Sequence, residues 1–300
     1  AASGARRPTN RITVAALLAQ AERRLARAKL TYGHGTRNAA EEALLLVAHV
    51  LGVPPLDTDA IVRRSVSAGD CVKAMALVDE RIKTRRPAAY VTGEAWLQGL
   101  RFRVDERVIV PRSFIAELLE DGLAPWIEYP EMVESAADIC TGSGCLGILL
   151  AHAFPNASID VVDISPDAIA VANINIKNYD LADQITAVQS DMFSGLKGKK
   201  YDLIISNPPY VDAPAMSALP QEYRNEPQIA LGSGVAGLDH THILLKEAKK
   251  YLNDDGILVV EIGHNRDALL DAYPELPFTW LDVESGNEFV FLLTKEQLPD

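Results

Sequence analysis

The stretch Ala136-Ala137-Asp138-Ile139-Cys140-Thr141-Gly142-Ser143-Gly144-Cys145-Leu146-Gly147 decides the fold of the longer part of this chain. Its first residues are mostly apolar, as in a buried strand, and an apolar helical segment follows at 145–153. Gly142 and Gly144 allow the backbone to turn tightly and to approach a ligand, while the helix after them presents free N–H groups. In open α/β sheets, ligands bind at the carboxyl ends of the strands. The stretch therefore predicts the first strand–turn–helix unit of a ligand-binding α/β domain.

The sequence on both sides of this unit predicts a doubly wound sheet. Short apolar strands alternate with helical segments after Ser135, and this alternation indicates a mostly parallel sheet. Only residues 284–287 separate the last two strands, so we expect the final strand to run antiparallel. The predicted strands span 136–140, 158–163, 185–190, 201–206, 256–262, 278–283 and 288–293, and helices span 145–153, 166–178 and 240–252.

The first ninety residues show helical spacing instead. Apolar residues recur at helical intervals from 12 to 28, a second apolar run over 43–51 stops at Gly52, and a third helix is predicted around 72–83. Alternating residues from Ala95 to Val110 predict a β-hairpin that links two domains. Ser113 is a plausible cap for a helix that runs to about Trp126. We expect a helical domain over 1–92, a hairpin linker over 93–112 and an α/β domain over 113–300.

Composition and charge limit the class of protein. The 300 residues are 48% hydrophobic and 23% charged, which is ordinary for a globular protein and argues against disorder and fibres. No run of about 18 apolar residues predicts a membrane span, and residues 1–8 lack an apolar signal core, so secretion is not expected. Three cysteines, none in a Cys-x-x-Cys pair, indicate a reducing compartment.

Charge is distributed unevenly along the chain. Residues 1–92 carry 15 Lys and Arg against 8 Asp and Glu, a net charge of +7. Residues 93–300 carry 14 against 33, a net charge of −19. The acidic part should repel bare nucleic acid and attract basic proteins, whereas the basic part could contact phosphates. Solvated helix faces without a charged partner would give the same pattern.

Polar residues at three successive strand ends indicate an adenosine-type ligand. Asp163 stands 21 residues after Gly142, and its carboxylate could accept both hydroxyl protons of a ribose. Asp191 follows the third strand and could accept from an adenine amino group, while Phe193 could cover the ring. Gly142-x-Gly144-x-x-Gly147 also matches the dinucleotide fingerprint. At this point the residues leave NAD and other adenosine cofactors open.

The loop Asn207-Pro208-Pro209-Tyr210 after the fourth strand discriminates between them. Two prolines end the strand and stiffen the loop, and neither has an N–H. The Asn207 side-chain oxygen and the Pro208 carbonyl therefore stand as acceptors on a rigid frame. Two fixed acceptors suit a planar –NH2 group, and Tyr210 could lie against its flat face. A strand-ending Pro-Pro turn with a packed tyrosine is the purely structural alternative.

This loop and the glycine-rich turn resemble the S-adenosylmethionine-dependent methyltransferases that modify planar nitrogens. Within that group, nearly the whole chain is similar to the HemK/Prm glutamine methyltransferases. In those proteins a small helical domain and a β-hairpin linker precede a seven-stranded, Rossmann-like class I methyltransferase domain. The segments that carry the similarity are Val110-Pro111-Arg112-Ser113, residues 223–227, 230–234 and 237–239, and the turn at 138–145.

The turn and Tyr223-Arg224-Asn225-Glu226-Pro227 are closer to the PrmB branch, which methylates a glutamine of a large-subunit ribosomal protein, L-three. The sibling branch acts on peptide-chain release factors and usually has Gly where Cys140 stands. It also has a Glu after its Val-Pro-Arg-Pro stretch, where this chain has Ser113 and Phe114.

The resemblance implies a cofactor, a substrate and a set of site residues. The cofactor is S-adenosyl-L-methionine, and the partner is a basic ribosomal protein, L-three. The charge of the N-terminal domain, rather than the resemblance, predicts contact with ribosomal RNA, and the cysteines predict the cytoplasm. Residues 1–92 would recognise the substrate. The implied catalytic residues are Asn207, Pro208 and Tyr210, and Pro209 joins them in binding substrate. The implied cofactor-binding residues are Thr141, Gly142, Ser143, Gly144, Asp163, Asp191, Phe193 and Asn207.

Three other functions would be compatible with parts of this sequence. A nucleic-acid amino methyltransferase would also suit the loop, but it would need a basic surface where residues 93–300 are acidic. An NAD-dependent dehydrogenase would leave the Asn-Pro-Pro-Tyr loop without a purpose, and a non-enzymatic scaffold would not need it. His240-x-His242 is the only closely spaced His pair. We interpret it as ordinary surface at a helix start and expect no metal.

Overall fold

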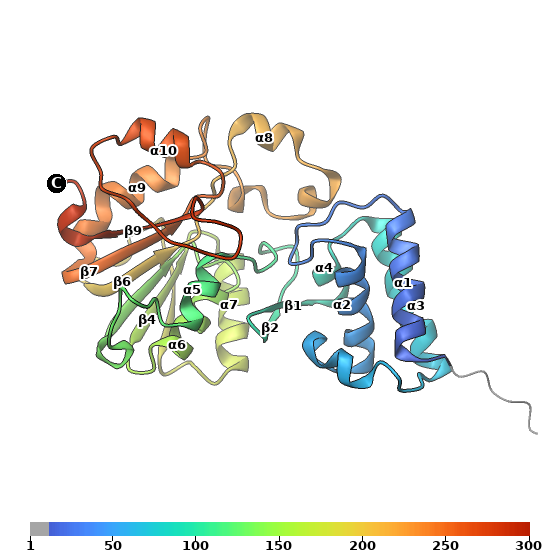
Figure 1. The fold of residues 1–300 in the computed structure, drawn as a ribbon. Coiled ribbons are helices and arrows are strands. Elements are labelled where there is room, and N and C mark those ends of the chain that lie inside the picture. The colour runs from blue at the N-terminus through green and yellow to red at the C-terminus, as the bar shows by residue number, and fades with distance from the viewer. Residues whose placement is uncertain (1–11) are drawn as a thin grey trace, which may run out of the picture. The chain divides into compact units, whose positions relative to one another are not determined.

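The computed structural model of the chain describes residues 12–300 (Figure 1). Residues 1–8, where the sequence shows no signal core, lie outside the described residues. The chain divides into two compact units, one ending at Thr92 and the other spanning Gly93–Asp300.

The first unit is helical. Side-chain caps begin its longer helices: Thr13 accepts from the Ala16 N–H, and Asn38 and Ser67 do the same for α2 and α3. Helix α2 ends at Gly52, whose left-handed backbone (φ 66°) suits a residue without a Cβ. The elements are α1 (Val14–Arg27), α2 (Ala39–Leu51), the 3-10 helix η1 (Pro55–Ile61), α3 (Ala68–Thr84) and α4 (Ala88–Thr92). The three predicted helices are present, and η1 and α4 were not foreseen.

Apolar faces of α1, α2 and α3 meet in one core that includes Leu17, Leu46 and Val78. A buried ion pair between Arg81 and Glu42 joins α3 to α2, with 3.0 Å between Nε and Oε2.

Within residues 12–300, no single helix has the length and hydropathy of a membrane span. The bent pair Ala39–Leu51 and Pro55–Ile61 reaches that threshold only when both helices are taken together.

The second unit opens with the predicted hairpin in shortened form. Strands β1 (Glu94–Leu97) and β2 (Leu100–Arg103) pair antiparallel around Gln98-Gly99, both with positive φ, as a tight two-residue hairpin turn requires. The expected extension of the second strand to Val110 is wrong. Residues 104–110 form no strand: the Val108 N–H closes a turn on the Asp105 carbonyl, and the Val110 N–H donates to Glu226 Oε1 over 2.9 Å.

Seven strands form the main sheet, as predicted. Their order is β5-β4-β3-β6-β7-β9-β8; β3 to β7 run parallel, and β9 runs antiparallel to both of its neighbours. The final antiparallel strand is thus confirmed. The strands are β3 (Ser135–Ile139), β4 (Ser158–Asp163), β5 (Ile185–Gln189), β6 (Tyr201–Ser206), β7 (Leu252–Glu261), β8 (Thr279–Trp280) and β9 (Val290–Thr294).

Helices cover both faces of this sheet. Alternate residues Ala137 and Ile139 of β3 share one core with Leu244 and Leu269, so α9 and α10 cover that face. Helices α5, α6 and α7 pack side by side and contact strands β3, β4, β5 and β7 (Figure 1). The helices are α5 (Ile115–Glu120), α6 (Cys145–Ala153), α7 (Pro166–Asn178), α8 (Ala213–Ala218), α9 (Asp239–Glu247) and α10 (Arg266–Ala272). Short 3-10 helices span Pro130–Met132, Gln221–Asn225, Gln228–Ala230, Ala248–Tyr251 and Lys295–Gln297.

Three predicted boundaries are wrong. The helix expected to run to Trp126 ends at Glu120, because Gly122 and Leu123 adopt left-handed backbone. The segment expected as a helix to 252 changes to a 3-10 turn at Ala248, and β7 begins at Leu252. The strand expected over 278–283 shrinks to two residues.

Candidate functional site

One buried carboxylate organises the glycine-rich turn. Asp138 near the end of β3 accepts from the Thr141 hydroxyl (2.5 Å) and from the Gly147 N–H (3.1 Å) through the same oxygen, Oδ2. The side chain is fully buried, and this burial raises the pKa of Asp138 to about 7. Gly144 adopts φ 80° directly before α6. The turn and the first turn of α6 are therefore held by an acid in an otherwise apolar strand, a role that the sequence analysis missed.

Asp163 at the end of β4 ties the turn to the neighbouring strand. Its Oδ2 accepts from the Gly142 N–H (2.9 Å) and its Oδ1 from the Ser165 N–H (3.0 Å). Burial raises the pKa of Asp163 against these hydrogen bonds, which lower it. A carboxylate has about four lone-pair positions, so Asp163 keeps capacity for a further donor.

A cavity lies along the carboxyl ends of the strands. It encloses about 780 Å³, part of it open to solvent, and Asp163, Asp191, Asn207 and Pro209 are among its lining residues. Four of the predicted site residues from three different strand ends thus meet at one cavity. Thr141, Gly142, Ser143, Gly144, Pro208 and Tyr210 do not line it.

The sequence predicts that Phe193 covers an adenine ring, but this residue does not line the cavity. Its side chain is fully buried in the sheet core and stacks on Tyr251, with 4.7 Å between ring centroids. Met192, one residue earlier, lines the cavity instead. Its sulfur lies 3.8 Å from that of Cys140, which also lines the cavity.

His240 also lines the cavity, so the interpretation of this residue as ordinary surface is wrong. Its Nδ1 lies 2.7 Å from Ser233 Oγ, and burial lowers its pKa against the opposing charges of Asp239 and Asp191. His242 has a different partner, the Tyr273 hydroxyl. Within residues 12–300, no group of three or more His, Cys, Asp or Glu side chains could hold a metal ion.

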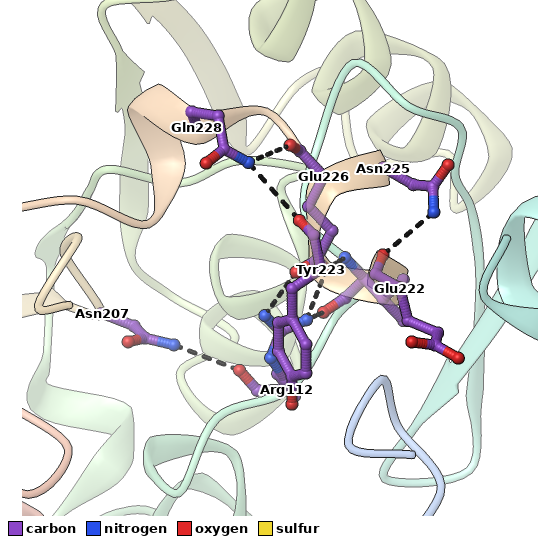
Figure 2. A network of polar contacts seen from close by, with 8 residues as sticks. Arg112, Asn207, Glu222, Tyr223, Asn225, Glu226 and Gln228 are labelled. Atoms are coloured by element: carbon purple, nitrogen blue, oxygen red, sulfur yellow. Dashed lines mark hydrogen bonds and ion pairs between the residues drawn. The ribbon is translucent and has the colours of Figure 1, made fainter. Parts of the chain in front are cut away.

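The Asn-Pro-Pro-Tyr loop follows β6 and is held at both ends. The Asn207 Nδ2 donates to the Arg112 carbonyl over 3.1 Å, and Figure 2 shows its Oδ1 on the opposite side of the amide. The Tyr210 carbonyl accepts from Asn265 Nδ2 over 2.7 Å. The Tyr210 hydroxyl lies 3.4 Å from Glu261 Oε1, and its ring packs so closely on Gly263 that a Cβ there would clash. A contact between Tyr210 and a substrate amide stays a prediction.

Two buried carboxylates, Glu226 and Glu261, hold the segment 110–114, and neither was among the predicted site residues. Glu226 pairs with Arg112, with 2.6 Å between Nη1 and Oε1. Glu261 at the end of β7 accepts from the Ser113 hydroxyl (2.6 Å) and from the Phe114 N–H (2.9 Å). Burial raises the pKa of Glu261 to about 7. The position of Glu261 at the end of a buried strand is a feature of the sequence that could have identified it. Glu226 has no such feature and is marked only by the similarity of residues 223–227 to the family.

Comparisons with known proteins agree with this geometry. A family model described as "Methyltransferase small domain" matches residues 123–222, and one described as "PrmC N-terminal domain" matches residues 16–93. The chain is 53% identical over 286 residues to a "Ribosomal protein uL3 glutamine methyltransferase" from Neisseria gonorrhoeae, covering 95% of each chain. A protein with the same name from Bordetella pertussis is 49% identical, covering 95% of this chain and 96% of its own.

Solved structures are more distant. A ribosomal protein L11 methylase from Lactobacillus delbrueckii subsp. bulgaricus is 20% identical, covering 64% of this chain and 83% of its own, with a TM-score of 0.44. A catalytic domain of hMettl16 in complex with an RNA hairpin is 16% identical, covering 76% and 81%, with a TM-score of 0.49.

The seven-stranded Rossmann-like sheet and the cavity at its carboxyl edge, with the matching domain model, define a class I methyltransferase. The chain belongs to the family of ribosomal protein uL3 glutamine methyltransferases. The resemblance to the HemK/Prm proteins, and to the ribosomal-protein branch among them, is confirmed.

Proposed function

We propose that this protein transfers the methyl group of S-adenosyl-L-methionine to the side-chain amide nitrogen of a glutamine in ribosomal protein uL3. The observation that carries the proposal is the orientation of Asn207. Its Nδ2 is engaged by the Arg112 carbonyl, so Oδ1 is the atom left for a donor. With the Pro208 carbonyl one residue later, the loop offers two acceptors to one –NH2 group. The names of the relatives at about 50% identity support uL3 as the substrate.

The cavity suits an adenosine cofactor. Acidic side chains line it at the ends of β4 and β5, Asn207 lines it at the end of β6, and apolar side chains such as Val162 and Met192 lie between them. We infer that Asp163 accepts the ribose hydroxyl protons and that Asp191 accepts from the adenine amino group. Residues 141–144 do not line the cavity themselves, but the Gly142 N–H donates to Asp163, which does, so we infer that this turn borders the remainder of the cofactor next to the start of α6. S-adenosylmethionine supplies an electrophilic methyl group on a sulfonium.

Asn207 and Pro208 would compensate for the low reactivity of the amide nitrogen that accepts the methyl group. An amide nitrogen is unreactive because its lone pair is delocalised into the carbonyl. Asn207 Oδ1 and the Pro208 carbonyl would hold the nitrogen in line with the methyl group by accepting both N–H bonds. Such positioning contributes about 7–11 kcal/mol in favourable cases. The same acceptors stabilise the positive charge that develops on nitrogen. No strong base is needed before transfer, because the methylated amide then loses its proton readily.

The two units would then have separate tasks. We propose that residues 1–92 recognise the substrate, that 93–112 link the parts and that 113–300 perform the transfer. Exposed arginines on α1, among them Arg23 and Arg27, support contact between the basic unit and ribosomal RNA. The acidic catalytic part favours a basic protein as the methyl acceptor. Cys71, Cys140 and Cys145 are unpaired, which supports a reducing compartment and hence the cytoplasm.

Transfer of labelled methyl from S-adenosylmethionine to separated ribosomal proteins, release factors, DNA and RNA tests the proposal. We expect label on uL3 alone, located at a glutamine by mass spectrometry. Label on a release factor would retain the chemistry but replace the substrate. Label confined to nucleic acid, or no transfer to any of the four, would overturn the proposed function.

A further inference from the structure

The side chain that orients the proposed substrate amide is itself held by a backbone atom. Asn207 Nδ2 donates to the Arg112 carbonyl, which belongs to a segment without regular secondary structure. A carbonyl in such a segment has no helix or strand to fix its position. The geometry at Asn207 therefore depends on whatever holds residues 110–112.

Glu226 holds this segment through three hydrogen bonds. Its Oε1 accepts from the Val110 N–H (2.9 Å) and from Arg112 Nη1 (2.6 Å), and its Oε2 accepts from Arg112 Nη2 (2.8 Å). Arg112 Nη1 also donates to the Val110 carbonyl over 3.1 Å. Figure 2 shows this network beside Asn207. The side chain of Arg112 and the backbone of Val110 are thus both held by Glu226, which lies 114 positions after Arg112 in the chain.

The energetics favour a rigid arrangement. The Glu226 side chain is fully buried and that of Arg112 is 24% exposed, so solvent screens the pair only weakly. The contact is bidentate, which fixes the relative orientation of two planar groups as well as their separation. The Tyr223 ring lies 5.8 Å from the guanidinium carbon and covers it on one side. Loss of one partner would leave a charge without compensation in a buried site.

We propose that the Arg112–Glu226 pair is the positioning device for Asn207: it fixes the Arg112 carbonyl, which in turn aims the Asn207 amide oxygen at the substrate. Neither side chain is assigned a contact with the reacting atoms, so both are positioning residues rather than catalytic ones. The alternative is a clamp that stabilises the fold without affecting Asn207. The kinetic part of the inference rests on the proposed function, whereas its structural part concerns Asn207 alone.

The structural part is tested without any substrate. In a ¹⁵N-labelled protein, the side-chain amide signals of Asn207 are the pair that disappears in Asn207→Ala. We expect Glu226→Gln to shift and broaden this pair, because the loss of the bidentate contact frees the Arg112 carbonyl. Asp160→Asn is the matched control: Asp160 is a carboxylate of the same unit, 10% exposed, paired with Lys199. It should leave the Asn207 pair unchanged.

An unchanged Asn207 pair in Glu226→Gln would overturn the inference, whatever the enzyme's substrate proves to be. If Glu226→Gln gives no folded spectrum, Arg112→Lys provides the same test, because it keeps the charge but loses the planar fork. Here too the Asn207 signals must move for the inference to stand.

The kinetic part uses a double-mutant cycle. With uL3 as substrate, Glu226→Gln should lower kcat by up to about 10²-fold, the effect of a misplaced reacting group, with little change in the KM for S-adenosylmethionine. In the Asn207→Ala background the same substitution should cause no further loss, because its effect passes through Asn207. Independent, multiplicative losses would indicate a merely structural role and overturn the inference. Inactivity of the unmodified protein would instead count against the proposed function.

Discussion

The Asn207 Nδ2 donates a hydrogen bond to the Arg112 carbonyl. Its side-chain oxygen, Oδ1, accepts no hydrogen bond from the described residues. Asn207→Ala removes that acceptor and leaves the Arg112 carbonyl in place. We expect turnover to fall on the order of 10²–10⁴-fold while cofactor affinity changes little, because a preorganised polar group acts mainly in the transition state. Methyl transfer under saturating substrate measures the first quantity and calorimetry the second. A variant within tenfold of the parent would rule out the assigned role.

Asp163 should act on the cofactor instead. Asp163→Ala removes both the proposed ribose acceptor and the partner of the Gly142 N–H. We expect the binding of S-adenosylmethionine to weaken by about 1–3 kcal/mol, the range for a lost charge-assisted hydrogen bond. Isothermal calorimetry gives the value directly. Asp160→Ala on the same strand is the control, and equal affinities in the two variants would contradict the assignment.

The raised pKa of Glu261 makes stability depend on pH. Burial raises this pKa from 4.5 to about 7, so the folded state binds more protons than the unfolded state between these values. The contribution of Glu261 to the unfolding free energy should therefore be fully present below pH 4.5 and be lost as the pH rises through 7, a change of about 3 kcal/mol. Glu261→Gln should flatten the slope in part, because Asp138 titrates in the same range. Urea unfolding at several pH values tests this, and an unaltered slope would refute it.

Single residues also show where sequence reasoning reaches its limit. Asp163, Asp191 and Asn207 could be found because they end consecutive parallel strands, and the topology brings such ends together. Phe193 could not be placed, because a residue just beyond a strand end points to the cavity or to the core according to the local backbone. The partner of Arg112 is 114 residues away, beyond any helical or strand period.

At the scale of secondary structure, hydrophobic periodicity predicts those elements whose ends are set by residues close in the sequence. Helices α6 and α7 match their predicted spans, because each begins at a sharp turn and carries a buried face. The apolar residues beyond α5 predict a helix, but this pattern does not reveal the left-handed backbone at Leu123 that ends it. The ladder of strand β8 with β9 comprises Thr279 and Trp280, and one further backbone hydrogen bond, from the Leu281 N–H to the Val290 carbonyl, ends it. The predicted ends of helices and strands are wrong where backbone hydrogen bonding, rather than the hydrophobic pattern of the sequence, determines the length of the element.

The contact between α6 and β4 yields a prediction at this scale. Gly147 lies against Val161 so closely that an alanine Cβ would overlap the Cγ1 of that valine. Gly147→Ala should destabilise the second unit by about 1–3 kcal/mol through overpacking, even though alanine favours helix. Urea unfolding followed by circular dichroism measures the change.

Val161→Ala provides the control, because it removes the overlapping methyl group. The double variant Gly147→Ala/Val161→Ala should lose less stability than the sum of the two single losses. Additive losses would show that the glycine is required for a reason other than space.

Considered as a whole, the chain couples a basic unit to an acidic one. The net charges of +7 and −19 were read directly from the sequence, but their assignment to separate bodies needed the division after Thr92. An acidic catalytic unit suits a basic protein substrate, and ribosomal proteins are embedded in RNA that such a unit would repel. The basic unit resolves this conflict if it contacts the RNA phosphates of an assembly intermediate.

The salt dependence of binding distinguishes this arrangement from a substrate met as free protein. Arg23→Glu/Arg27→Glu reverses two exposed charges on α1, and Lys197→Glu/Lys246→Glu reverses two exposed charges on the catalytic unit as the matched control. For binding to an RNA-containing particle, each lost phosphate contact should reduce the slope of log K against log salt by about 0.7–0.9. We expect the slope to fall for the α1 variant and to hold for the control. Equal slopes would mean that the basic unit does not contact RNA, and its charge would then be an ordinary solvated helix face.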